Sequence, residues 1–121
     1  MFTTVTNEFS WGVIDWLAGA EVGNSSELSV AKMSLSAGCE TDTHLHDNCE
    51  EAVYVISGAI DCVVDGSIHQ LVAGDHTVMP RGVRHQLRNS GSTPAELVLS
   101  YSSATRNFAL ADNGDLGSIQ A

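Results

Sequence analysis

The sequence predicts an all-β fold in a single domain, and three observations support this. The 121-residue chain breaks into short segments rich in Val, Ile and Leu, which Gly, Asn, Asp and Ser separate. Signals for helices are nearly absent. A chain of this length buries one hydrophobic core rather than two. Together these features are typical of a β-sandwich or β-barrel.

Each predicted strand ends at a turn signal. The strands are residues 27–35, 43–46, 51–56, 59–64, 68–72, 77–79, 84–89 and 95–101. Asp65 and Gly66 form a strong hairpin signal between two of them, because both residues tolerate a positive φ. Residues 11–16 are expected to form a covering strand. Its tryptophans, Trp11 and Trp16, are expected either at a subunit interface or at one end of the barrel.

These patterns divide the chain into three parts. Residues 1–25 are expected to be a covering segment, residues 26–101 the barrel and residues 102–121 a polar tail. We expect the tail to be loosely packed, with one short turn of helix near residues 108–110.

Charge and composition exclude several classes of partner. Fifteen acidic residues against five basic ones give a formal net charge of −10, so binding to nucleic acid or to anionic membranes is not expected. The opening residues carry no secretory signal pattern, and no apolar run could span a bilayer. Three cysteines, an odd number, argue against a disulfide framework. We therefore expect a cytoplasmic protein.

Three histidines and a glutamate carry the clearest chemical signal. His44 and His46 lie two residues apart on a predicted strand, so both side chains leave the same face. Glu51 opens the next strand, where a hairpin could bring its carboxylate opposite the two histidines. His85 follows a turn at Pro80. Such a set suits one divalent transition metal ion, namely Fe, Mn, Ni, Cu, Co or Zn, and has too many nitrogen atoms for Ca or Mg.

Two stretches of the chain resemble the two motifs of the cupin superfamily. The first motif is a Gly, five residues, His-x-His, a short gap, Glu, six residues and Gly, and it is matched by Gly38, His44, His46, Glu51 and Gly58. The second is a Gly, five residues, Pro-x-Gly, two residues, His, three residues and Asn, and it is matched by Gly74, Pro80, Gly82, His85 and Asn89.

The resemblance covers residues 38–89 and fills every motif position. It implies a jelly-roll β-barrel with a metal inside, bound by His44, His46, Glu51 and His85. The spacing to the second glycine of the first motif selects Glu51 over its neighbour Glu50. The resemblance also implies a homodimer, since small cupins commonly pair through their sheets and exchange terminal strands.

Further residues are candidates for catalysis. Arg81 and Arg84 fall in the turn before His85, near the expected rim of the barrel, where they could attract an anionic small-molecule substrate. The alternative is pairing with nearby surface acids. Tyr101 ends the last strand and could present its hydroxyl group to the cavity as an acid, a base or a hydrogen-bond donor. The alternative is an ordinary core tyrosine. Glu51 could itself act as a base.

The function predicted from these features is a metal-dependent enzyme that acts on a small organic molecule. Oxygen-dependent oxidation or cleavage, as in a dioxygenase, is slightly preferred. One alternative is a metal-dependent lyase or isomerase without redox chemistry, acting on a small acid or sugar. A second is a protein that binds a metal and a small molecule without turnover.

Overall fold

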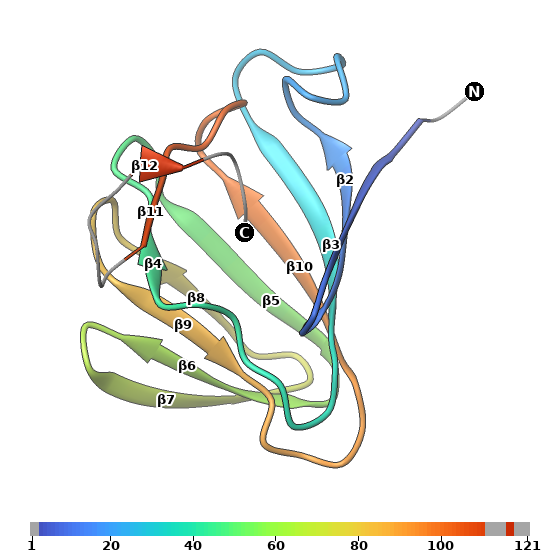
Figure 1. Ribbon diagram of the computed structural model, residues 1–121, viewed down its shortest axis with the longest axis vertical. Coiled ribbons are helices and arrows are strands. Elements are labelled where there is room, and N and C mark those ends of the chain that lie inside the picture. Colours follow the sequence, from blue (N-terminus) through green and yellow to red (C-terminus); the bar gives the residue numbers. More distant parts are fainter. Residues whose placement is uncertain (1–2, 111–115, 118–121) are drawn as a thin grey trace.

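A computed structural model describes residues 3–110 and 116–117 of the chain and shows two antiparallel six-stranded sheets that face each other (Figure 1). The first sheet has the order β1-β2-β3-β10-β5-β8 and the second the order β12-β11-β4-β9-β6-β7. The first sheet contains β1 (Val5–Phe9), β2 (Gly12–Ala18), β3 (Ser29–Leu35), β10 (Ala95–Tyr101), β5 (Glu51–Ser57) and β8 (His76–Met79). The second contains β12 (Leu116–Gly117), β11 (Phe108–Leu110), β4 (His44–Leu45), β9 (His85–Arg88), β6 (Ala59–Val64) and β7 (Ser67–Val72).

The fold is therefore the predicted all-β jelly roll, and side-chain alternation explains its core. In β3 and β10 alternate residues are buried, which is the pattern of strands with one face on a core and one in solvent. The buried faces of the two sheets meet in one hydrophobic cluster, which includes Met33, Val53, Ile60, Leu87 and Leu97. None of the described residues forms a helix that could cross a membrane.

Turn chemistry sets the registers that the sequence predicts. Asp65 has a φ of 48° and Gly66 a φ of 83°, and they join β6 to β7 with Val64 opposite Ser67. Gly58, the last glycine of the first motif, has a φ of 83°. A Cβ atom there would lie 3.0 Å from the Cα atom of Ala95. This position therefore needs glycine both for its positive φ and for the close approach of the backbone at Ala95.

The N-terminal region forms two strands rather than one covering strand. β1 and β2 pair with each other, and β2 also pairs with β3, so both extend the first sheet. Trp16 is 1% exposed and Trp11 8% exposed. Both tryptophans are thus buried within the chain itself, with Trp11 stacked on Phe9 at 4.5 Å between ring centroids.

The expected turn of helix near residues 108–110 is wrong. These residues form β11, which pairs with β4, and Phe108 and Ala109 are buried. Ala104 and Arg106 are buried as well. The apolar residues here fill the end of the barrel, and pairing with β4 satisfies their backbone groups. The rest of the predicted tail lies outside the described residues, except for β12.

Candidate metal centre

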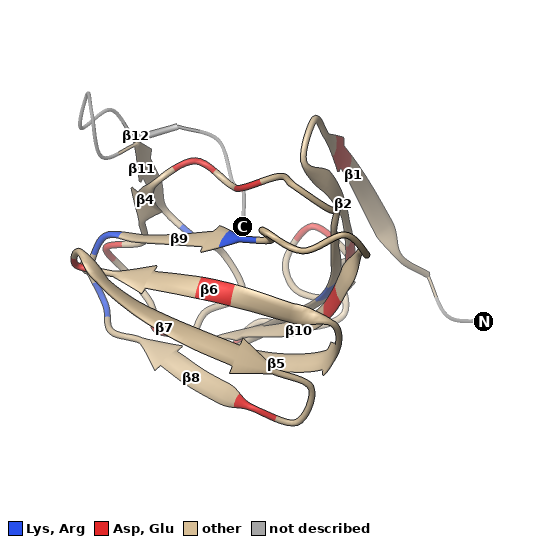
Figure 2. Ribbon diagram, turned by 90° about the horizontal axis from the view of Figure 1, so that it is seen from below, with Lys and Arg blue, Asp and Glu red and all other residues tan. Residues whose placement is uncertain are grey.

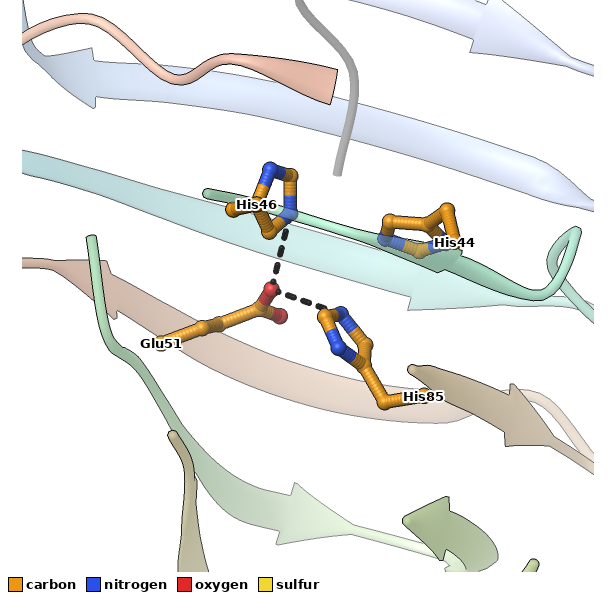
Figure 3. Close-up of side chains that lie close together, drawn as sticks. All are labelled: His44, His46, Glu51 and His85. Atoms are coloured by element: carbon orange, nitrogen blue, oxygen red, sulfur yellow. Dashed lines mark ion pairs between the residues drawn. The ribbon is translucent and has the colours of Figure 1, made fainter. Parts of the chain in front are cut away.

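Four side chains, carried by both sheets, point toward one another in a single cluster (Figure 3). His44 in β4 lies directly opposite His85 in β9, within the second sheet. His46 follows β4, and its side chain shares a face with that of His44, as predicted, with ring centroids 5.1 Å apart. Glu51 begins β5 in the first sheet.

Glu51 reaches the histidines by a route that the sequence did not predict. A hairpin between the strands of His44 and Glu51 was expected, but β4 and β5 belong to different sheets. Glu51 pairs instead with Met79 on one side and Tyr101 on the other. Its carboxylate therefore faces the histidines across the interior of the barrel, because the two sheets pack face to face.

The inward-facing atoms of these four residues are close together and buried. One ligand atom from each residue lies within 4.8 Å of the others, and each side chain is at most 3% exposed. Oε1 of Glu51 is 3.3 Å from Nε2 of His46 and 3.2 Å from Nε2 of His85. Within the described residues, Oε1 of Glu51 and all three Nε2 atoms lack a hydrogen-bond partner.

The other ring nitrogen of each histidine, Nδ1, is within hydrogen-bond distance of a backbone carbonyl. Nδ1 of His44 is 2.7 Å from the carbonyl oxygen of Asp42, and Nδ1 of His46 is 2.8 Å from that of Asn107. Nδ1 of His85 is 3.1 Å from the carbonyl oxygen of Val83. A carbonyl oxygen only accepts hydrogen bonds, so Nδ1 must carry the proton. In a neutral imidazole this leaves the lone pair on Nε2, directed at the shared centre.

The ionisation of the cluster also favours a cation at its centre. Burial, with His85 nearby, lowers the pKa of His44 to about 3. Burial alone would raise the pKa of Glu51, but His85 and His46 outweigh it and hold that pKa well below its usual value. Burial alone would lower the pKa of His85, but the Glu51 carboxylate outweighs it and raises that pKa. The carboxylate thus stays ionised and attracts positive charge.

These residues fit a bound transition metal. Four buried polar atoms without a partner are costly unless something satisfies them. Three nitrogen atoms and one carboxylate oxygen form a donor set that Fe, Mn, Co, Ni, Cu and Zn accept. Histidine ligands in metal sites usually donate the other N–H to a carbonyl or carboxylate, and all three histidines have such an acceptor.

Tyr101 lies next to this cluster. Its ring is 5.4 Å from that of His46 and 5.7 Å from that of Trp16, measured between centroids. The side chain is buried, and its hydroxyl group has no hydrogen-bond partner in the described part of the chain. Burial, with the charge of Glu51 nearby, raises its pKa well above the usual value. The hydroxyl group therefore stays protonated.

Arg81 lies in the turn that precedes β9, Arg84 lies directly before the strand, and both side chains are exposed. Figure 2 shows basic residues at both ends of this strand. Within residues 3–110 neither arginine forms an ion pair, whereas Arg88 pairs with Glu40 at 3.3 Å. The turn itself contacts the site, since the N–H of Gly82 donates to the carbonyl of His46 at 2.7 Å.

Sequence reasoning missed the residues of the segment before β11. The side chain of Arg106 is fully buried, with Cζ 3.5 Å from the ring centroid of Trp16 and Nη2 3.0 Å from Oε2 of Glu21. Phe108 stacks on His44 with 4.9 Å between centroids. The one signal in the sequence was Phe108, a large apolar residue in a polar tail. Nothing in the pattern distinguished Arg106 from a surface arginine.

The remaining histidines and cysteines lie outside the cluster. His69 and His76 are exposed. Cys49, next to the site in sequence, is buried, and burial raises the pKa of its thiol to about 11. All three cysteines are free.

Comparison with known families places the chain. A family model described as a cupin domain matches residues 31–101, which is more than half of the sequence. The chain belongs to the cupin family. Protein SchB of Streptomyces halstedii is 37% identical over 76 residues, which cover 63% of this chain and 51% of SchB. This cupin therefore spans about half the length of that relative.

Solved structures agree with the family. A sugar phosphate isomerase of the cupin superfamily from Silicibacter pomeroyi has a TM-score of 0.68 and 27% identity, covering 82% of this chain and 66% of that protein. An oxalate oxidase has a TM-score of 0.73 and 25% identity, covering 84% of this chain and 55% of that protein. Such neighbours include both redox and non-redox enzymes.

Proposed function

We propose that this cupin is a metal-dependent enzyme acting on a small organic molecule, with one divalent transition metal held by His44, His46, Glu51 and His85. One observation carries the proposal. Four buried ligand atoms lie within 4.8 Å of one another and lack hydrogen-bond partners among the described residues. The three histidines have the Nδ1 acceptors that turn their Nε2 lone pairs inward.

A metal there would supply Lewis acidity, and with Fe, Mn, Cu or Ni it could also support oxygen-dependent oxidation or cleavage. We favour the oxygen-dependent reaction, supported by the similarity to an oxalate oxidase. The similarity to a sugar phosphate isomerase supports the alternative of a lyase or isomerase without redox chemistry. Metal-dependent binding of a small molecule without turnover is the third candidate.

The residues around the centre have distinct proposed roles. Tyr101, which stays protonated, would donate a hydrogen bond to the substrate or to its leaving oxygen. Glu51 would act first as a ligand, because its lowered pKa makes it a weak base. Arg81 and Arg84 are free to attract an anionic substrate, since neither forms an ion pair within the described residues.

Elemental analysis of protein purified without added metal tests the centre. We expect close to one transition metal ion per chain in the wild type and a large loss in His85→Ala, because that variant removes one of four ligands. Fe, Mn, Cu or Ni would lead to oxygen-uptake assays, and Zn to lyase or isomerase assays. His69→Ala, which changes an exposed histidine, is the matched control. If no metal binds even after reconstitution, the proposal fails.

We also propose a homodimer in the cytoplasm. The outer face of the first sheet supports the dimer, because Val30, Ala52 and Val78 line an apolar groove there of about 470 Å³. Tyr54 and Ile56 extend this exposed face. The three free cysteines support a reducing compartment.

A further inference from the structure

The three histidines of the metal centre are not held in the same way. His44 and His85 donate from Nδ1 to the carbonyls of Asp42 and Val83, each two residues earlier on its own segment. His46 donates instead to the carbonyl of Asn107, 61 residues away in sequence. The orientation of His46 therefore depends on where the segment before β11 lies, whereas the other two rings are oriented locally.

The side chain of Asn48 fixes that segment on both sides of Arg106, directly before the Asn107 carbonyl. Its Nδ2 donates to the carbonyl of Thr105 at 2.9 Å, and its Oδ1 accepts from the N–H of Asn107 at 2.9 Å. Nδ2 of Asn107 also donates to Oδ1 of Asp47 at 2.8 Å. The loop between His46 and Glu51 is in this way fastened to the residue whose carbonyl orients His46.

The neighbouring residues leave this segment little freedom elsewhere. Arg106 is anchored on Trp16 and on Glu21, and Phe108 stacks on His44. Asn48 is only half-buried and contributes little apolar packing. Asn48 therefore contributes mainly through its two hydrogen bonds, which help to orient the Asn107 carbonyl.

We propose that Asn48 is a positioning residue of the metal centre, which acts through the Asn107 carbonyl to hold the ring of His46 with Nε2 toward the metal. The inference rests on the proposed metal site. Without the two hydrogen bonds the backbone between the anchored side chains of Arg106 and Phe108 loses the contacts that set its orientation, so Nδ1 of His46 no longer faces a fixed acceptor. The ring then spends less time in the geometry for ligation. Partners of this kind typically contribute 10- to 100-fold in metal affinity.

The test compares zinc-loaded wild type with Asn48→Ala. We expect zinc to transfer to excess EDTA about tenfold faster in the variant. In protein labelled with ¹⁵N-histidine, the Nδ1–H proton of His46 should exchange faster with water in Asn48→Ala. The Nδ1–H protons of His44 and His85 should be unchanged, because their acceptors are local.

Asn24→Ala is the matched control. Asn24 lies in the loop between β2 and β3, and its side chain also forms two hydrogen bonds with the backbone. Its Nδ2 donates to the carbonyl of Leu17, and its Oδ1 accepts from the N–H of Gly19. Zinc release at the wild-type rate in Asn24→Ala, with faster release in Asn48→Ala, supports the inference. Equal rates in wild type and Asn48→Ala, or an equal increase in both variants, overturn it. A wild type that binds no zinc refutes the metal centre itself.

Discussion

Tyr101 places a hydroxyl group beside the candidate metal centre with no hydrogen-bond partner among the described residues. A buried donor left unpaired costs about 1–3 kcal/mol. In the protein this hydroxyl group can either bind a water molecule or, under the proposed function, donate a hydrogen bond to the substrate. The two possibilities differ in what the loss of the oxygen atom does.

Tyr101→Phe removes the hydroxyl group and keeps the ring between His46 and Trp16. We expect the free energy of unfolding to change by about 1 kcal/mol or less, since no hydrogen bond to a described residue is lost. If Tyr101 donates to substrate, kcat should fall by ~10²-fold while metal content stays constant. Thermal denaturation, elemental analysis and steady-state kinetics measure the three quantities. An unchanged kcat would show that Tyr101 does not donate to the substrate and serves only to pack the core.

At the scale of elements, the turn before β9 joins the candidate metal centre to the surface. Its Gly82 N–H donates to His46, whereas Arg81 and Arg84 extend into solvent. One short segment thus combines a backbone hydrogen bond to a candidate ligand with exposed positive charge at the rim. The loop between His46 and Glu51 likewise combines two roles, because it connects two candidate ligands and its Asn48 also contacts the segment before β11.

Replacing both rim arginines, Arg81→Ala with Arg84→Ala, tests their role in substrate capture. We expect KM for an anionic substrate to rise about fivefold with kcat unchanged, because each exposed charge contributes at most about 1 kcal/mol. The rise should shrink at high salt, where exposed charges are screened. Arg88→Ala, which breaks the surface pair with Glu40, is the control. A KM that does not move would exclude the arginines from binding.

At the scale of the whole molecule, the two outer faces differ. The first sheet presents the apolar groove of Val30, Ala52 and Val78, whereas the second sheet exposes Ile68 and Val72 on β7. A homodimer that buries the groove would remove the larger apolar surface from water.

Sedimentation velocity of Val78→Glu checks this arrangement. We expect the wild type to sediment as a dimer and Val78→Glu as a monomer, because the new carboxylate would be buried without a partner. Ile68→Glu introduces the same charge at a residue that is 61% exposed in the other sheet and should leave the dimer intact. A monomeric wild type, or dissociation of both variants, would contradict the proposed interface.

The sequence by itself determined the fold class, the hairpin at Asp65 and Gly66, and the four candidate ligands. Each follows from information local in the chain, namely side-chain alternation, turn propensity and the spacing of the two motifs. Only the tertiary structure decided that Glu51 faces the histidines from the other sheet, that Arg106 is buried on Trp16, and that Asn107 orients His46. These contacts join segments far apart in sequence. They depend on how the two sheets close over the core, which no local pattern encodes.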